Sequence, residues 1–408
     1  MATTILEKPF HDAIAADQIN GMVMEGRSVS GGSYSSYIGQ RIAPDSTAKP
    51  LDPSSMPYMA SATKLLATIA ALQLVDRGDL SLDKDLRPAL PKLTAMGVLQ
   101  DFDSDTGATT NPLTDPLTLR QMLTHTAGMD YSFFNPLRNK YRSANPPPVP
   151  APNQMERFLM PATYQPGQGW MYGHGMDFAA YLVEQRTGER LDEYLRKNIF
   201  APVGISRDGI SFFPIREGLG DRMPDLSPQD PEGLGLAAVG GFNSHDGGDV
   251  CYGGHGAYVT ARAYVAVLES LMRNDEKILS RAMVEEMFRP QLDGKAYQSL
   301  QAALSGPGGS AFGCDTSGKG RNMGLGGLVT GEDGDGELGK GSLIWGGGHN
   351  TVWFIDRKNG ICGTASPQLS IPGNVTVAME LKSAFRTHLR LVLASTQSGG
   401  GEVFQDPR

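Results

Sequence analysis

The sequence predicts an α/β fold in which strands from both ends of the chain form one sheet around a helical middle. A weak alternating pattern with glycine punctuation over residues 20–43 indicates a twisted hairpin near the N-terminus. Apolar residues at helical spacing dominate the middle of the chain. Three short segments between residues 343 and 365 have the character of strands, and a long helix follows at 375–393. One sheet shared by the two ends explains this order of elements.

The composition excludes several classes of protein. The 408 residues are 40% hydrophobic and 20% charged, enough for one large two-lobed enzyme. A net charge of −8 argues against a nucleic-acid partner, and no apolar run approaches the length of a membrane span. Residues 1–10 lack the apolar core of a secretion signal, and the three cysteines form no Cys-x-x-Cys pair. We therefore expect reduced thiols and a cytoplasmic location.

The first half of the chain is expected to alternate short regular elements with polar loops. Its expected segments are, in order, a helix at 5–16, the hairpin at 20–43, a helix that begins near residue 61 and stops at Gly78, a polar loop at 79–95, and a short helix at 117–123 capped by Thr118. The proline-rich stretch 145–152 is incompatible with a helix or a central strand, so we expect an extended loop there.

The second half is expected to begin with helices and end with strands. Its expected segments are helices at 175–187 and 191–199, an irregular region at 205–250, helices at 260–272 and 280–288, strands at 343–345, 351–355 and 361–365 with a turn at 357–360, the helix at 375–393 and a disordered tail at 398–401.

The strongest catalytic candidate is the pair Ser61 and Lys64 at the start of an apolar helix. Residues three apart share one face of a helix, so the hydroxyl and the amine would lie side by side. The free N–H groups and the positive end of the dipole favour an alkoxide there. Ser-x-x-Lys occurs three times, whereas about one match is expected by chance in a chain of this length, and only the match at Ser61 opens an apolar helix. The alternative is a simple N-cap serine.

Three further segments carry candidate side chains. His125 follows the helix at 117–123 and is either a general base or a histidine that braces a turn. Tyr172 precedes the helix at 175–187 and is either a proton shuttle or an aromatic anchor of the helix start. Trp345 precedes three glycines, 346–348, which either let a substrate carbonyl approach backbone N–H groups or form a tight turn.

Two other motifs match known binding patterns only in part. Residues 313–319 match Gly-x-x-x-x-Gly-Lys, but Gly320 replaces the hydroxyl residue that would bind magnesium, and no apolar strand precedes them. The acids at 332–337 miss the calcium-loop pattern, so a solvated turn is expected. The seven histidines are scattered without metal-ligand spacing, and no metal or cofactor is expected.

Taken together, these segments in this order resemble the serine β-lactamase and penicillin-binding-protein superfamily, and most of all its class C enzymes with their esterase and transesterase relatives. The resemblance covers about residues 10–393. The motifs that carry it are Ser61-Ala62-Thr63-Lys64, Leu123-Thr124-His125-Thr126-Ala127-Gly128, Tyr172-Gly173-His174, Gly253-Gly254-His255-Gly256, the glycines at 346–348 and Val352-Trp353-Phe354-Ile355-Asp356.

The resemblance implies a β-lactamase-like fold of the class C type. It would have a central antiparallel sheet flanked by helices, plus a mostly helical subdomain. We therefore expect a single domain over 1–408, with an α/β subdomain at about 1–80 and 300–408 and a helical subdomain at about 81–299.

The resemblance also implies roles for individual residues. Ser61 would be the nucleophile, Lys64 its base and Tyr172 the proton shuttle. Backbone N–H groups of Ser61 and Gly348 would form the oxyanion hole, with Gly347 beside it. Tyr131 matches a tyrosine that lines the site in relatives, and the resemblance implies that Tyr131, Trp345, His174 and Gly347 contact the substrate.

Two positions depart from the family pattern. His174 stands where the family has the asparagine of Tyr-x-Asn, so its part in substrate binding is open, as is that of His349. Trp345 stands where the lactamases have the lysine of Lys-Thr-Gly. The chain then lacks the cation that would hold a β-lactam carboxylate, and an apolar acyl group suits the tryptophan better.

The expected function is acyl transfer in secondary metabolism through a covalent enzyme intermediate. An ester or thioester, either free or held on a carrier protein, would donate the acyl group, and a small alcohol or amine would accept it. Lys64 must be neutral to take the proton of Ser61, and burial at a helix N-terminus would favour that state. Hydrolysis by the same site is the alternative, and a non-catalytic binding protein of this fold is a third reading.

Overall fold

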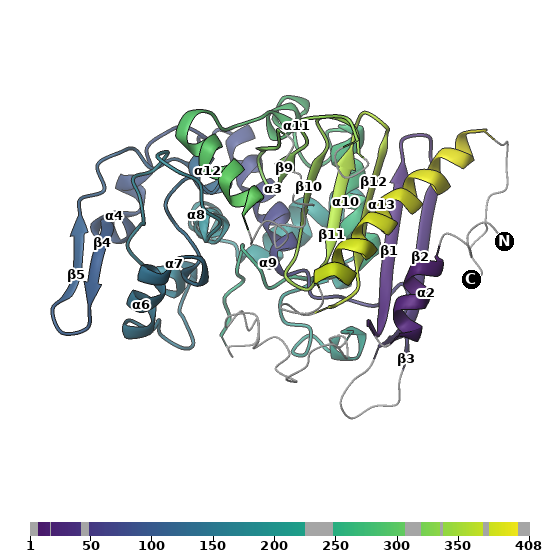
Figure 1. The fold of residues 1–408 in the computed structure, drawn as a ribbon, viewed down its shortest axis with the longest axis horizontal. Helices are drawn as coiled ribbons and strands as arrows, with labels where there is room; N and C mark the ends of the chain where they lie inside the picture. Colours follow the sequence, from purple (N-terminus) through teal and green to yellow (C-terminus); the bar gives the residue numbers. More distant parts are fainter. Residues whose placement is uncertain are drawn as a thin grey trace.

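The computed structural model describes residues 7–16, 18–41, 49–224, 248–306, 320–334, 338–369 and 375–398. Figure 1 shows a sheet with helices on both sides and a largely helical region beside it. The predicted motif at 313–319 and the tail beyond residue 398 lie outside the described residues. None of the described helices is long and apolar enough to cross a membrane.

The elements before residue 200 are mainly short helices and two hairpins. They are α2 (Lys8–Ala15), β1 (Gly21–Ser28), β2 (Ser33–Arg41), β3 (Lys49–Pro50), α3 (Thr63–Asp76), α4 (Pro91–Ala95), β4 (Val98–Asp103), β5 (Gly107–Asn111), α5 (Leu119–Leu123), α6 (Pro136–Ala144), α7 (Gln154–Phe158), α8 (Gly175–Thr187) and α9 (Leu191–Leu195), which continues as a π-helical turn over Arg196–Phe200.

The later elements are two short strands, three helices, the strands that complete the main sheet, and a final helix. They are β6 (Ile210–Ser211), β7 (Tyr258–Val259), α10 (Ala261–Arg273), α11 (Arg281–Phe288), α12 (Gly294–Ser305), β8 (Asn322–Met323), β9 (Leu328–Val329), β10 (Leu343–Gly346), β11 (Val352–Asp356), β12 (Ile361–Ser366) and α13 (Val375–Ser398).

Both ends of the chain build the main sheet, as predicted. Its eight strands run in the order β3-β2-β1-β12-β11-β10-β9-β8, and every neighbouring pair is antiparallel. The junction pairs β1 with β12, with Val23 opposite Ser366 and Ser28 opposite Ile361. A strand from each end of the sequence therefore meets in the middle of the sheet, and the predicted α/β class with a central antiparallel sheet is confirmed.

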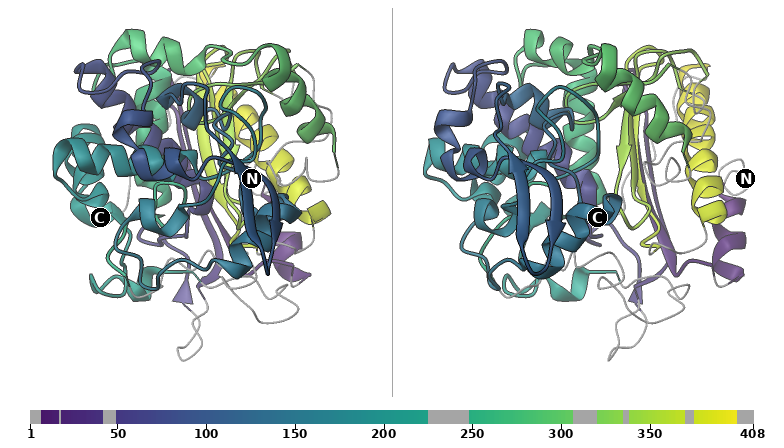
Figure 2. Two further views of the ribbon diagram at one scale, coloured as in Figure 1. Left: turned by 90° about the vertical axis from the view of Figure 1, so that its left-hand side faces the viewer. Right: turned by 60° about the vertical axis from the view of Figure 1, so that its left-hand side comes forward.

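Helices cover both faces of this sheet. Figure 2 shows α13 on one face, with α2 beside it, and the remaining helices on the other. The side chains of Phe385 and Leu389 in α13 fill the space above Gly363 and Gly26, where a Cβ atom would collide with them. On the opposite face α10 packs against β1, β12 and β11.

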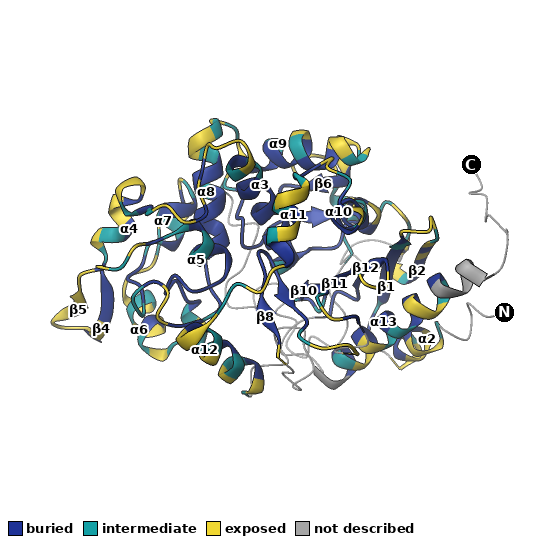
Figure 3. Cartoon of the chain, turned by 90° about the horizontal axis from the view of Figure 1, so that it is seen from above, coloured by how far each residue is buried: buried dark blue, intermediate teal, exposed yellow. Residues whose placement is uncertain are grey.

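Helix α3 is the central helix of the molecule. It lies between α8 and α9, and the turn that precedes it touches β10. Nearly all its side chains are buried, which explains why its apolar residues do not form a one-sided stripe (Figure 3). A helix surrounded by protein provides a rigid mount for the residues at its N-terminus.

Some predicted boundaries need correction. The segment 79–95 is not all loop, because Pro91 at the first helical position starts α4. The sequence also did not predict the β4–β5 hairpin or helices α6, α7 and α12. The division into an α/β and a helical subdomain stays a prediction.

Candidate active site

Ser61 lies in a 3-10 turn, Ala60–Ala62, immediately before α3. Ala60 has φ +44°, a left-handed conformation that is strained for a residue with a side chain. Ser61 is only partly buried, whereas Lys64, one turn on, is 1% exposed. The turn therefore presents the hydroxyl at the N-terminus of a buried helix, where backbone N–H groups are free to face a developing negative charge.

Lys64 is the centre of the site's hydrogen bonds. Its Nζ donates to the Oγ of Ser61 at 3.3 Å, to the hydroxyl of Tyr131 at 2.8 Å and to the backbone oxygen of Gly254 at 2.7 Å. All three acceptors are neutral groups. The amine therefore lies within reach of the serine hydroxyl, as a group that takes the proton of a serine must.

Two tyrosines enclose the amine of Lys64. The Nζ atom lies 4.7 Å from the ring centroid of Tyr172 and 5.2 Å from that of Tyr131, and the two rings meet edge to face with centroids 5.0 Å apart. Both are buried. The structure thus brings Ser61, Lys64 and Tyr172 together, and it gives Tyr131, which was predicted only to bind substrate, the direct hydroxyl contact with Lys64.

Backbone hydrogen bonds hold the segments that carry Tyr131 and Tyr172 side by side. Tyr131 N–H donates to the oxygen of Tyr172, and His174 N–H donates to the oxygen of Met129. A Cβ atom on Gly173 would lie 1.8 Å from the Met129 oxygen, so only glycine fits between these segments. Gly173, the second residue of the Tyr-Gly-His motif, therefore allows the two segments to pack closely.

The two histidines beside the tyrosines are buried and neutral. Nδ1 of His125 accepts from the N–H of Gly173, which supports the bracing role considered for it. His174 stacks on Phe158 and touches the edge of Tyr131 with centroids 4.3 Å apart, so the structure shows it supporting Tyr131. Burial, helped by the charge of Lys64, lowers the pKa of His125 well below its usual range, and burial does the same for His174.

The end of β10 lies against the turn that carries Ser61. A Cβ atom on Gly347 would lie 2.3 Å from the oxygen of Met59 and 3.3 Å from the Cβ of Ala60, the residue before Ser61. Trp345 is buried beside Tyr172, with ring centroids 5.4 Å apart, and stacks on His125. Its side chain forms an apolar wall at the position where the lactamases have the lysine that would hold a β-lactam carboxylate.

The ring of His349 lies 5.2 Å from that of Tyr58, three residues before Ser61. The same Tyr58 is tied to the far end of β12, because the side chain of Gln368 accepts from its N–H and donates to its oxygen. The segment that leads to Ser61 therefore contacts the loop between β10 and β11 and the residues that follow β12.

Asp177 is a buried residue of the site that sequence reasoning missed. Its Oδ1 accepts from the N–H of Gly254 at 2.7 Å, and its Oδ2 lies 3.3 Å from Nδ1 of His174. Burial raises the pKa of this carboxyl, although His255 and Lys64 nearby act in the opposite direction. The Gly-Gly-His-Gly run pointed to this neighbourhood, but no spacing in the sequence joins it to Asp177.

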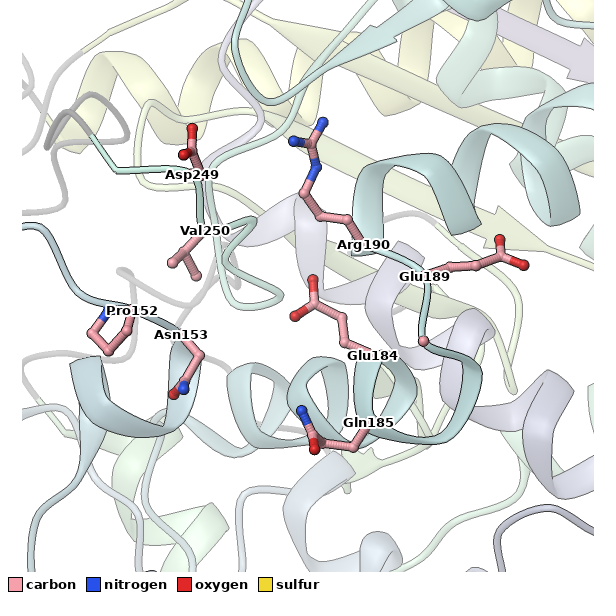
Figure 4. A pocket seen from close by; sticks show the side chains of 9 residues that line it. Pro152, Asn153, Glu184, Gln185, Glu189, Arg190, Asp249 and Val250 are labelled. Carbon is pink, nitrogen blue, oxygen red and sulfur yellow. The ribbon is translucent and has the colours of Figure 1, made fainter.

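A separate pocket of about 390 Å³ opens elsewhere on α8 (Figure 4). Its lining includes Glu184, Glu189, Arg190 and Asp249 but none of the predicted site residues. Its charges are engaged, since Arg190 pairs with Asp192 and Asp249 with Arg216. In the described ranges, no group of three or more His, Cys, Asp or Glu side chains is arranged to hold a metal ion.

Comparison with known proteins agrees with this geometry. The Beta-lactamase family model matches residues 23–379. The lovastatin esterase of Penicillium rubens is 40% identical over 93% of this chain and 96% of its own length. The monacolin J acid methylbutanoyltransferase of Aspergillus terreus is 34% identical over 97% and 96%. The unliganded simvastatin synthase of Aspergillus terreus superposes with a TM-score of 0.82 at 32% identity, over 98% of this chain and 99% of its own. The chain is therefore an enzyme of the beta-lactamase family.

Proposed function

We propose that the protein transfers acyl groups through an ester on Ser61. Lys64 takes the proton of Ser61 as Oγ attacks the carbonyl of an ester or thioester donor. The carbon–oxygen or carbon–sulfur bond of the donor then breaks, and the proton passes to the leaving group with the help of Tyr172. An alcohol or amine acceptor next gives up a proton by the same route and attacks the acyl-enzyme, which releases Ser61.

The contact between Lys64 and Ser61 carries this proposal. A serine is a weak nucleophile until an adjacent base takes its proton, and a buried amine 3.3 Å away can do so. The N–H groups of Ser61 and Gly348 would receive the negative charge on the carbonyl oxygen. Each such donor typically contributes about 10²–10³ in rate. Tyr131 would hold Lys64 in place.

The relatives support transfer within fungal-type secondary metabolism. Several are named acyltransferases or methylbutanoyltransferases, which favours a short branched acyl group. Hydrolysis is the second candidate, because the relative at 40% identity is named an esterase. Both reactions share the acyl-enzyme and differ in whether water or the acceptor reaches it. A carrier-bound thioester donor and a cytosolic setting are further parts of the proposal.

Intact-mass spectrometry tests the shared step. The protein incubated with p-nitrophenyl butyrate should gain one butyryl group on Ser61, and Ser61→Ala should gain none. Addition of an alcohol should then yield its butyrate ester faster than free butyrate. Free butyrate as the dominant product would favour the hydrolase, and absence of the adduct together with no labelling by a fluorophosphonate probe would refute the proposal.

A further inference from the structure

Asp177 and Lys64 are linked through a single residue, Gly254. The carboxylate of Asp177 accepts the N–H of Gly254 at 2.7 Å, and the oxygen of Gly254 accepts the Nζ of Lys64 at 2.7 Å. All three groups are buried, and the side chains of Asp177 and Lys64 are at most 1% exposed. The position of the carbonyl on Lys64 therefore depends on the carboxylate behind it.

The glycines at 253 and 254 are packed too closely for any other residue. A Cβ atom on Gly254 would lie 2.4 Å from Oδ2 of Asp177, and one on Gly253 would lie 2.5 Å from the oxygen of Met176. The segment is therefore seated directly on the first turn of α8. Because this contact leaves no free space, movement of Asp177 would move Gly254.

Helix capping does not account for Asp177. An acidic residue at the third position of a helix commonly reaches back to the N–H of the N-cap residue. In α8 that residue is His174, and its N–H donates instead to the oxygen of Met129. The side chain of Asp177 is directed to Gly254 and His174, toward the base of the site.

We propose that Asp177 is a positioning residue for the general base. It holds the oxygen of Gly254 on Lys64, and its charge stabilises the ammonium group that forms when Ser61 loses its proton. Through His174, which touches Tyr131, it also supports the hydroxyl that Lys64 bonds. This inference depends on the proposed function, in which Lys64 is the base.

The titratable groups around Asp177 and Lys64 should not change charge near neutral pH, so they should not obscure the pH dependence of acylation. His174 and His255 face Asp177, and burial lowers the pKa of His255 to about 3 and that of His174 well below its usual range. Burial also raises the pKa of Tyr131 and Tyr58, whose hydroxyls therefore stay protonated. His125, Tyr172 and Ser61 complete the groups facing Lys64. The histidines are neutral at neutral pH, so they do not account for a change in rate there.

The test is Asp177→Asn, which keeps the shape of the side chain and removes its charge. The burst of p-nitrophenol from p-nitrophenyl butyrate, measured against pH, reports acylation of Ser61. We expect the maximal rate to fall about tenfold, the effect of losing one interaction with a charged group. The limb over which the rate rises with pH should move to lower pH, because the ammonium loses a stabilising charge. KM should change less than about twofold, because Asp177 is fully buried and exposes no surface to a substrate.

Asp356→Asn is the matched control. Asp356 is also fully buried and also accepts the N–H of a tightly packed glycine, Gly339, at 2.8 Å. Its variant should keep the wild-type pH profile. If Asp177→Asn does not fold, Asp177→Ser is the smaller neutral substitute and should shift the profile in the same direction.

A folded Asp177 variant with the wild-type rate and pH profile would overturn the inference, as would an equal shift in Asp356→Asn. Failure of the proposed function gives a different result. In that case the wild-type protein itself would show no butyryl group on Ser61.

Discussion

Replacing Tyr131 with phenylalanine isolates the contact that the structure adds to the predicted site. The change removes the oxygen that accepts from Lys64 at 2.8 Å. It keeps the ring, whose neighbours Tyr172 and His174 lie 5.0 Å and 4.3 Å away between centroids. The fold should therefore be retained, and the loss should fall on the position of the amine.

The magnitude follows from the hydrogen bond between Tyr131 and Lys64, because Lys64 becomes a charged ammonium group as it takes the proton of Ser61. A hydrogen bond to a charged group contributes about 1.5–3 kcal/mol, and each 1.36 kcal/mol of barrier is about tenfold in rate. Lys64 keeps its bond to Gly254, so the lower half of that range applies. We expect acylation to slow by about 10- to 50-fold.

The assay is the pre-steady-state release of p-nitrophenol, with thermal unfolding as a check on folding. Tyr194→Phe is the control, because Tyr194 is equally buried and its hydroxyl bonds Gln73 at 3.0 Å and not Lys64. It should acylate at the wild-type rate. A folded Tyr131→Phe enzyme within twofold of wild type would show that the hydroxyl does not position the base.

Two further predictions follow from the packing and the charges. Gly347→Ala should slow acylation by at least about 100-fold, because its Cβ would lie 2.3 Å from the oxygen of Met59 and displace the neighbouring oxyanion donor. A rate of p-nitrophenol release that stays near the wild-type rate would contradict the oxyanion role. Hydrogen bonds from Arg289 and Arg120 lower the pKa of Glu286 from 4.5 to about 2, so its ionised form stabilises the folded state above pH 4.5 and this contribution is lost as the pH falls toward 2. Denaturant titrations should show wild type losing its advantage over Glu286→Gln across that interval, whereas a pH-independent difference would count against this explanation.

The sequence predicted the elements whose signals are local and apolar. Helix α3 and strands β10–β12 were identified because their apolar runs are bounded by glycine or by an Asn-Gly turn. Helix α5 was identified with its cap, since Thr118 and Gln121 form a complete capping box.

The missed elements have weak or polar signals. Helix α6 begins with a capped Asn-Pro start, but it is polar overall and only Leu137 and Tyr141 carry large apolar side chains after Pro136, so its apolar signal is weak. Strand β5 is exposed along its whole length and takes its structure from pairing with β4. The secondary structure of these segments depends on contacts with other parts of the chain, and a single sequence does not show such contacts.

The candidate site shows the same division. Ser61, Lys64 and Tyr172 come from motifs and lie together in the structure. The contact of Tyr131 with Lys64 spans 67 positions in the chain, and that of Lys64 with Gly254 spans 190. Such contacts arise only from the folded backbone, and this is why Asp177 carried no signal before the structure was known.

The meeting of β1 with β12, and of the Ser61 turn with Gly347, has a consequence for biosynthesis. The ribosome releases the serine and its lysine early, whereas the glycines proposed to complete the oxyanion hole emerge nearly three hundred residues later. A nascent chain would thus carry the proposed nucleophile in an inert form until the last strands dock. Labelling by a serine-directed probe should then report completion of the sheet, and a chain truncated before β10 should stay unlabelled.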